Sequence, residues 1–403
     1  MHVLIVSNLF PPEVIGGAEK HAKSDAEYLV DRGHKVSVIT TGVDGPIHGF
    51  SWKEREGVDV YRTKPLNMYS PFEHQDKLGW KKPIQHIIDQ WNPQTYTLVR
   101  QHINDLDPDI IHVHNYSGLS KSVFSASAVV ECPVIHTLHD YNSLHIRPSL
   151  FSNGEIITPG RLMGVYQKYN DLLIGSNIDK VIAPSQFIID KHHEQGVFDG
   201  ISSECVPLGI ETTGIKHYDG GADDQDGTRL LFAGQLTYSK GVDILIDAVK
   251  QLDGSDLELH ILGKGPYREV LEEQVEGDGR IKFHGFVSEQ ELARQYTNAD
   301  YTVVPSRWYD NSPMVIYESY ARHTPVIGAN IGGIPELIEK GETGFCFEPE
   351  QPDDLADVIE DNKNKSDMLA ENLADVDVSL DTHVDRLIEV YESLIHQSAR
   401  AVN

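Results

Sequence analysis

The stretch from Ala299 to Glu336 reads ADYTVVPSRWYDNSPMVIYESYARHTPVIGANIGGIPE, and it decides the fold class. Tyr301 to Val304 is a short β-branched and aromatic run ended by a Pro-Ser pair, which predicts a buried strand. A polar loop then leads to Pro313, which suits the first position of a helix because its missing N–H needs no partner there, with Ser312 as the cap. A further strand begins at Val326. This order predicts an open α/β sheet, in which ligands bind at the carboxyl ends of the strands.

Two carboxylates in this stretch are candidate ligand contacts. Asp310 precedes the predicted helix, whose free N–H groups suit an anion such as phosphate. Glu318 shares a helix face with Met314 and Val315, so its carboxylate should lie part-way into apolar packing, where it needs a partner. The alternative is a structural ion pair between Glu318 and Arg322, four residues on, worth about 0.3–0.5 kcal/mol if exposed.

Length and composition limit the class of protein. At 403 residues, two domains of about 200 residues each are expected. No apolar run reaches about 18 residues, and an apolar strand starts directly after Met1, so we expect neither a membrane span nor a signal peptide. The cysteines (Cys132, Cys205 and Cys346) are far apart in sequence. This spacing fits a reduced, cytoplasmic protein without disulfides or a cysteine-based metal site.

The net charge of −28 argues against a nucleic-acid partner, because phosphates would be repelled. Two explanations of the acidic excess stay open. The protein is either halophilic, with high salt screening its self-repulsion, or simply an acidic enzyme. Melting temperature measured against KCl separates the two, since only a halophilic protein gains stability between low and molar salt.

The first half begins with a βαβ pattern. His2 to Ser7 is a continuous apolar strand, Gly16 and Gly17 open a helix that carries Glu19, and Lys35 to Thr40 is the next strand. The glycine pair lets a phosphate approach backbone N–H groups, although a plain turn explains it as well. The dinucleotide fingerprint GxGxxG is absent from this turn, which argues against an NAD-binding domain.

Histidines collect at the ends of two predicted strands. The predicted strand from Asp109 to His114 ends in His112 and His114, and the next predicted strand, from Pro133 to Leu138, leads to His139 and Asp140. Three interpretations stay open. His112 and His114 could form a metal pair, but the sequence offers it no clear carboxylate or cysteine; the rings could be buried structural imidazoles; or they could take part in catalysis.

The domain boundary is predicted at residues 212–228, which are rich in Gly and Asp and have a linker composition. The domains are then 1–211 and 229–380, with residues 381–403 as a final amphipathic helix. Near the start of the second domain, Lys240 precedes a helix. A cation there opposes the helix dipole unless an anionic ligand lies beside it, and the alternative is a solvated lysine.

As a set, these motifs resemble those of glycosyltransferase family 4, retaining enzymes of the GT-B fold that use nucleotide-sugars. In that family two glutamates with seven residues between them follow a strand, and here Asp310 and Glu318 stand at those places, the first one methylene shorter. The family's Gly-Arg-Leu…Lys-Gly element is present with Gln235 in place of the arginine and Lys240 in place of the lysine. Thr137 to Asp140 (TLHD) matches its Thr-x-His element.

The resemblance implies an α/β fold of two Rossmann-like domains with parallel sheets facing across a cleft. The first domain would bind the acceptor and the second the nucleotide-sugar. The C-terminal helix would return to the first domain.

The resemblance also implies roles for single residues. Glu318 would hold the ribose hydroxyls, while Asp310 and His139 would address the transferred sugar and Asp140 would fix the tautomer of His139. The other donor-binding positions are Gly17, Gln235, Lys240, Phe286, Val287, Asn311, Ser312, Pro313, Met314 and Val315. The acceptor-side positions are Gly16, Glu19, His114 and Asp140.

The implied reaction moves a hexose from a nucleotide-diphosphate sugar to a glycan, a lipid-linked or a small acceptor with retention of configuration, as in polysaccharide biosynthesis. Positioning and leaving-group stabilisation supply the rate, so neither a cofactor nor a metal is expected. Two alternatives are a nucleotide-sugar epimerase of similar fold and a non-catalytic nucleotide-sugar-binding protein. The departures at Asp310 and Gln235 are the features that favour the last.

Residues 65–104 combine aromatic residues with a local basic cluster around Trp80, formed by Lys77, Lys81 and Lys82. Two interpretations stay open: peripheral contact with the cytoplasmic face of a membrane, or an ordinary helix and loop on the acceptor side. Flotation with anionic liposomes separates them, since only a membrane-binding protein rises with the lipid.

Overall fold

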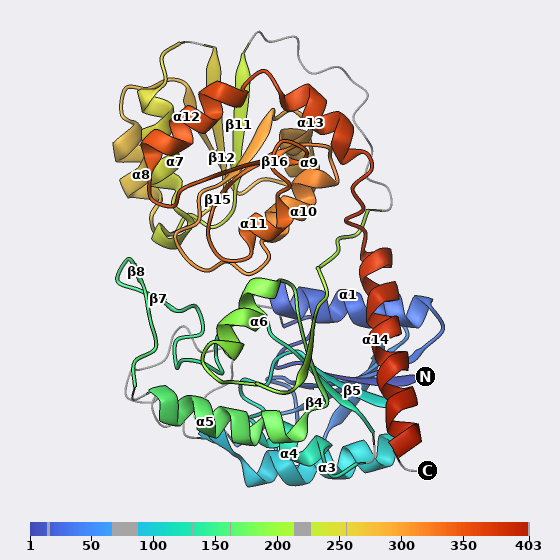
Figure 1. The fold of residues 1–403 in the computed structure, drawn as a ribbon. Coiled ribbons are helices and arrows are strands. Elements are labelled where there is room, and N and C mark those ends of the chain that lie inside the picture. The colour runs from blue at the N-terminus through green and yellow to red at the C-terminus, as the bar shows by residue number, and fades with distance from the viewer. Residues whose placement is uncertain are drawn as a thin grey trace. The chain divides into compact units, whose positions relative to one another are not determined.

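The computed structural model describes residues 1–13, 17–66, 88–130, 132–161, 163–212, 227–254 and 256–401. It divides the chain into two compact units, each built on its own sheet (Figure 1). Unit 1 comprises Met1–Pro148, Pro159–Pro207 and His383–Asn403, and unit 2 comprises Ser149–Thr158 and Leu208–Thr382. The last residues of the chain therefore belong to the same unit as the first. The basic cluster around Trp80 lies outside the described residues.

Unit 1 contains an eight-stranded sheet with the order β10-β9-β6-β5-β1-β2-β4-β3. All neighbours pair in parallel except the edge strand β3, which forms an antiparallel hairpin with β4. The central strand β1 is buried along its whole length, as its unbroken apolar sequence predicts. The strands are β1 His2–Val6, β2 Lys35–Thr41, β3 Ser51–Arg55, β4 Val58–Thr63, β5 Ile110–Val113, β6 Val134–Thr137, β9 Lys180–Ala183 and β10 Ser202–Cys205.

The helices of unit 1 cover its sheet, with α1 on the opposite face from α3, α4 and α5 (Figure 1). Asn92 caps α3 by accepting hydrogen bonds from two backbone N–H groups, and Pro93 stands at its first position. The last helix, α14, contacts the sheet through Tyr391, whose hydroxyl lies 2.6 Å from Nδ1 of His112. The helices are α1 Gly17–Asp31, α3 Pro93–Leu106, α4 Ser122–Ser127, α5 Met163–Leu173, α6 Gln186–His193 and α14 Leu380–Ala401.

Unit 2 contains a six-stranded, fully parallel sheet with the order β13-β12-β11-β14-β15-β16. The order reverses between β11 and β14, which makes this place a topological switch point, where open α/β sheets bind ligands. Its strands are β11 Thr228–Ala233, β12 Leu257–Leu262, β13 Ile281–Gly285, β14 Tyr301–Val304, β15 Val326–Ala329 and β16 Gly344–Phe347. A short hairpin, β7 Phe151–Ser152 and β8 Glu155–Ile156, also belongs to unit 2.

Helix α7 supplies much of the core of unit 2, because its apolar residues pack against the sheet strands and α12. The helices are α7 Val242–Gln251, α8 Arg268–Val275, α9 Glu289–Thr297, α10 Met314–Tyr320, α11 Ile334–Leu337, α12 Pro352–Asn362 and α13 Ser366–Leu373.

One local prediction in the deciding stretch was wrong. Helix α10 begins at Met314, and its N-cap is Pro313 rather than Ser312. The hydroxyl of Ser312 lies 2.8 Å from that of Tyr317, one turn into the helix, so it is satisfied by a side chain and not by the helix N-terminus. The predicted strand from Tyr301 to Val304 has the bounds of β14.

Candidate active site

A pocket of about 440 Å³ lies in unit 2 beyond the carboxyl ends of β11, β12 and β13. It brings together five of the residues that the sequence analysis named, although they are up to 83 positions apart in the chain: Gln235, Phe286, Val287, Val315 and Glu318. The remaining lining residues are mostly glycine and apolar side chains, with Lys264 as a cation. An apolar pocket lined by a few polar groups has the composition of a small-molecule site.

The floor of this pocket requires glycine. Gly263, directly after β12, has a φ of +134°, and a Cβ added there would stand 1.8 Å from the carbonyl oxygen of Gly234. Neither the backbone conformation nor the space admits a side chain. The loops after β11 and β12 therefore approach each other closely, which exposes their backbone to the pocket.

Glu318 lies on the wall of the pocket and is half-buried on α10. Its Oε2 accepts a hydrogen bond of 2.8 Å from the hydroxyl of Tyr296, a fully buried residue on α9. Burial and the neighbouring Glu318 carboxylate raise the pKa of Tyr296 well above its usual range, so the phenol stays protonated and continues to donate. Arg322 donates a 2.8 Å bond to the backbone carbonyl of Glu318, and its guanidinium lies 5.4 Å from the centre of the Tyr296 ring. The Tyr296 hydroxyl thus fixes the orientation of the Glu318 carboxylate.

Phe286 stands at the rim of the pocket with 79% of its surface exposed. The ammonium group of Lys264 lies 5.4 Å from the centre of its ring. An exposed aromatic face beside a cavity is a stacking surface for a flat ring.

Lys240 and Asp310 form an ion pair through Nζ and Oδ2. Lys240 ends the turn after β11, its side chain is 27% exposed, and its ammonium lies 5.3 Å from the Trp308 ring. Asp310 is almost completely buried, and Ser306 donates a longer hydrogen bond of 3.4 Å to the same oxygen. Lys240, predicted to bind the donor, and Asp310, predicted to address the transferred sugar, therefore contact each other.

The backbone around Asp310 is fixed by the loop after β15. The N–H of Gly333 donates a 2.8 Å bond to the carbonyl of Asp310. Gly332 has a φ of +64°, and a Cβ added to it would stand 2.5 Å from that same carbonyl oxygen. This close approach explains why position 332 in the loop after β15 is a glycine.

Four predicted donor positions lie between Asp310 and the pocket wall. Asn311 and Ser312 are half-buried, Pro313 is the N-cap of α10, and Met314 is its first residue and packs against the apolar core of unit 2. Val315, the next residue, lines the pocket itself.

In unit 1 the structure places His139 beside His114. Nε2 of His139 lies 3.2 Å from Nδ1 of His114, and the two rings stack with centroids 5.4 Å apart. Burial, reinforced by neighbouring imidazoles, lowers the pKa of both histidines well below the usual range. His139 is therefore a neutral imidazole at pH 7, able to donate or accept one hydrogen bond but carrying no positive charge.

The other acceptor-side residues surround these rings. Asp140 accepts a 2.8 Å bond from the N–H of Asn142, and burial raises its pKa to about 6. Glu19 is buried in the first turn of α1, and a Cβ added to Gly17 at the start of that helix would meet no atom within 4 Å. Gly16 lies outside the described residues. The assignment of Asp140 as the group that fixes the His139 tautomer stays a prediction.

His112 is a structural histidine. Its Nδ1 pairs with the Tyr391 hydroxyl and its Nε2 with the hydroxyl of Thr137. Both nitrogens are used, and burial lowers its pKa to about 3. This excludes His112 from the metal pair that its alternation with His114 allowed.

Sequence reasoning missed Tyr296, the partner of Glu318. A weak signal exists, because Tyr296 is an aromatic residue a few positions before the predicted strand that leads to Asp310. Nothing in the spacing, however, tells which helix lies beside α10.

Two family models match the chain. The one described as Glycosyltransferase Family 4 matches residues 15–213, and the one described as Glycosyl transferases group 1 matches residues 219–374. Together they span most of both units. The chain belongs to glycosyltransferase family 4.

This glycosyltransferase is 26% identical over 364 residues to an uncharacterized glycosyltransferase of Methanocaldococcus jannaschii, a match that covers 88% of this chain and 87% of the relative. Among solved structures it resembles sucrose-phosphate synthase from Thermosynechococcus elongatus, with a TM-score of 0.71, 18% identity and coverage of 98% and 99% of the two chains. It also resembles Anabaena HepE in complex with UDP, with a TM-score of 0.69, 20% identity and coverage of 98% and 100%. The GT-B fold expected from the sequence is confirmed.

Of the helices that the structure describes, none combines the length and the apolar character that crossing a membrane requires.

Proposed function

We propose that this glycosyltransferase binds a nucleotide-diphosphate sugar in the unit 2 pocket and transfers the sugar to an acceptor with retention of configuration. The observation that carries the proposal is the carboxylate of Glu318, held by Tyr296 on the wall of a 440 Å³ cavity. A carboxylate accepts hydrogen bonds from the two adjacent hydroxyls of a ribose, and each charged hydrogen bond contributes about 1.5–3 kcal/mol.

The rest of the pocket suits the nucleoside end of such a donor. The exposed face of Phe286 offers a stacking surface for the base, and Val287, Leu262 and Leu292 supply apolar walls. Gln235 also lines the pocket and can donate hydrogen bonds to phosphate without adding charge. The replacement of the family's arginine by Gln235 therefore changes the strength of the phosphate contact but not its position.

Charge for the departing diphosphate would come from Lys240. Its pairing with Asp310 holds the ammonium in one orientation before a ligand arrives, which lowers the entropy that binding must overcome. The Asp310 carboxylate would then accept a hydrogen bond from a hydroxyl of the transferred sugar. Because the leaving diphosphate is stabilised by these fixed groups, the transfer requires neither a protein nucleophile nor a metal.

Retention and the acceptor are the finer parts of the proposal. The family resemblance supports retention, and it favours a glycan or a lipid-linked acceptor. Anabaena HepE, whose structures hold UDP and UDP-glucose, makes the uridine nucleotides the first donors to test.

The test is a panel of uridine, guanosine and adenosine diphosphate sugars, each examined by calorimetry and then incubated with candidate acceptors. We expect one donor to bind and to release its nucleoside diphosphate only when an acceptor is present. Proton NMR of the first product should show the anomeric configuration of the donor. Conversion of the donor to an epimer without an acceptor would support an epimerase, binding without turnover would support a non-catalytic protein, and an inverted product would contradict retention.

A further inference from the structure

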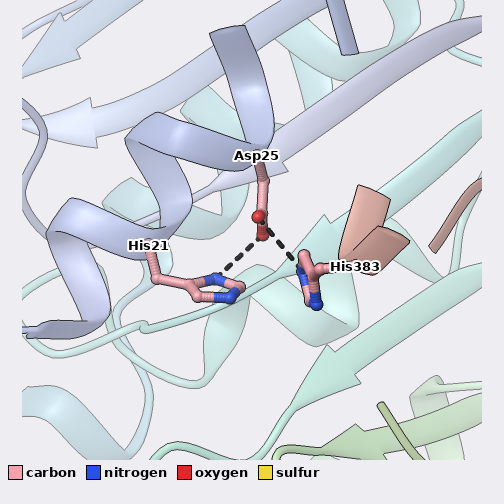
Figure 2. Close-up of side chains that lie close together, drawn as sticks. All are labelled: His21, Asp25 and His383. Atoms are coloured by element: carbon pink, nitrogen blue, oxygen red, sulfur yellow. Dashed lines mark ion pairs between the residues drawn. The ribbon is translucent and has the colours of Figure 1, made fainter. Parts of the chain in front are cut away.

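Three buried side chains of unit 1 converge on one point, His21 and Asp25 from α1 and His383 from the first turns of α14 (Figure 2). Nδ1 of His21 lies 3.0 Å from Oδ2 of Asp25, and Nε2 of His383 lies 3.2 Å from Oδ1. Each residue offers one ligand atom such that all three lie within 4.8 Å of one another. We call this group the His21–Asp25–His383 cluster.

The cluster is sealed from water. Asp25 has no exposed surface, and His21 and His383 are 8% and 6% exposed. A fourth ring, that of His114, places Nε2 3.6 Å from Oδ2 of Asp25 and is itself 2% exposed. One carboxylate is thus surrounded by three imidazoles in a part of the protein where an unsatisfied polar atom is costly.

The short distances in the cluster are those of ion pairs rather than of well-aligned hydrogen bonds. Both oxygens of Asp25, both nitrogens of His21 and Nε2 of His114 and His383 are buried without a hydrogen-bond partner, because the angles do not suit one. One ligand atom from each of His21, Asp25 and His383 lies within 4.8 Å of the other two, which is close enough for a single ion to bind all three. A tetrahedral Zn²⁺ with bonds of about 2.0–2.1 Å separates neighbouring ligand atoms by roughly 3.3 Å.

The tautomer of His383 strengthens this interpretation. Its Nδ1–H donates a 2.6 Å hydrogen bond to the carbonyl of Pro207, which can only accept. In the neutral ring Nε2 therefore carries a lone pair, and that lone pair faces the carboxylate of Asp25. Two lone pairs face each other stably only with a proton or a cation between them. Metal-bound histidines usually make the same backbone contact through their second nitrogen.

We propose that His21, Asp25 and His383 bind a structural Zn²⁺ ion, and that the His114 side chain shifts so that its Nε2, which lies 3.6 Å from Asp25, completes the tetrahedron. Two or three imidazoles and one carboxylate are a donor set that Zn²⁺ prefers and that Mg²⁺ does not. Because all four side chains are buried, the coordination sphere is closed, which is typical of a structural rather than a catalytic ion.

The ion would stabilise the point at which the chain returns from unit 2 to unit 1. His383 is the first residue of unit 1 after unit 2, and Pro207, its hydrogen-bond partner, is the last residue before the chain leaves unit 1. The site joins both ends to α1 in the interior of the unit. The sequence analysis lacked a carboxylate for a histidine metal pair. The structure supplies Asp25 and pairs it with His114 but not with His112.

The test uses the full chain without a histidine tag, stripped with a chelator and then loaded with Zn²⁺ or Co²⁺ alone. We expect one ion per chain to survive desalting, and the Co²⁺ form to show the intense visible absorption of tetrahedral cobalt. Added Zn²⁺ should raise the melting temperature by about 5 °C, because it binds the folded chain only, and Mg²⁺ should not compete. If the wild-type chain retains no ion and shows no tetrahedral spectrum, the cluster is a proton-linked imidazole–carboxylate network and the proposal is wrong.

Variants locate the ion. Asp25→Asn keeps the shape of the side chain and removes its charge, and His383→Gln removes one nitrogen ligand. Both should lose the tetrahedral spectrum and at least tenfold in Zn²⁺ affinity. His192→Phe is the matched control, since it removes a buried imidazole from the same unit that lies outside the cluster, and it should bind Zn²⁺ as the wild type does. Equal affinity in all four proteins would place the ion elsewhere, for example at the stacked pair of His260 and His284, and would overturn the assignment.

Discussion

Two carboxylates, Glu318 in unit 2 and Asp25 in unit 1, are held in opposite ways. Glu318 is half-buried on the wall of a cavity, and a neutral tyrosine orients it. Asp25 is fully buried among imidazoles; burial alone would raise its pKa, but His21 and His383 lower it well below the usual range. A carboxylate that lines a cavity can still accept hydrogen bonds from a ligand that binds reversibly. A carboxylate that is fully buried has a structural role.

The largest effect that this comparison predicts is on Glu318→Ala. Loss of two charged hydrogen bonds, worth about 1.5–3 kcal/mol each, should lower kcat/KM for the donor by roughly 10²- to 10³-fold or more. The fold should survive, but the melting temperature should fall by several degrees, because the buried Tyr296 hydroxyl loses its acceptor. Steady-state transfer assays and thermal denaturation measure the two quantities. Turnover like that of the wild type would remove Glu318 from the site.

Lys240→Ala should have the next largest effect. It should reduce the rate of transfer about 100-fold if the ammonium contacts the diphosphate. The variant also leaves Asp310 buried without its partner, and that structural effect must be separated from the catalytic one. The double variant Lys240→Ala, Asp310→Asn removes both charges. It should regain stability without regaining transfer, as measured by denaturant unfolding and by initial rates. Recovery of both would show that Lys240 serves only to neutralise Asp310.

Tyr296→Phe tests the support beneath Glu318 and should have a smaller effect. Without the hydroxyl, the carboxylate loses its orienting bond, and we expect KM for the donor to rise about tenfold while kcat changes little. Tyr301→Phe is the matched control, since it also deletes a buried tyrosine hydroxyl in unit 2, one that donates to the carbonyl of Asn362. It should cost similar stability and leave KM unchanged. An equal rise in KM in both variants would point to a general loosening of unit 2.

Much of this contrast could be predicted from the sequence, and part of it could not. Periodicity and turn residues gave the strand at Tyr301, the helix after Pro313 and the position of Glu318 on its inner face. Local patterns do not tell which distant side chains meet, so they could not reveal that Tyr296 supports Glu318, that Lys240 pairs with Asp310 or that His383 reaches Asp25. The last contact joins residues 358 positions apart, and it depends on where α14 packs in unit 1.

The last effect is on stability and not on transfer, and it concerns His192, a buried histidine that contacts neither Glu318 nor Asp25. Burial lowers the pKa of His192 to about 4, whereas the unfolded chain protonates this histidine near 6.5. The unfolded state therefore binds more protons between these values, and the folded protein loses stability as pH falls from 6.5 to 4. His192→Phe should remove up to roughly 3 kcal/mol of that loss, because phenylalanine carries no titrating group. Its flat ring can replace the imidazole that stacks against Phe198. Urea unfolding at pH 7 and pH 4.5 measures the difference. A variant with the same pH dependence as the wild type would contradict the assignment.

The most direct test of the central claim is calorimetry of the matching nucleoside diphosphate with the wild type, Glu318→Gln and Glu371→Gln. Glu371 is an exposed glutamate on α13 in the same unit, so its variant controls for the loss of one charge. We predict that the wild type and Glu371→Gln bind with equal affinity, and that Glu318→Gln binds at least tenfold more weakly. Equal binding by all three proteins would contradict the account of the unit 2 pocket.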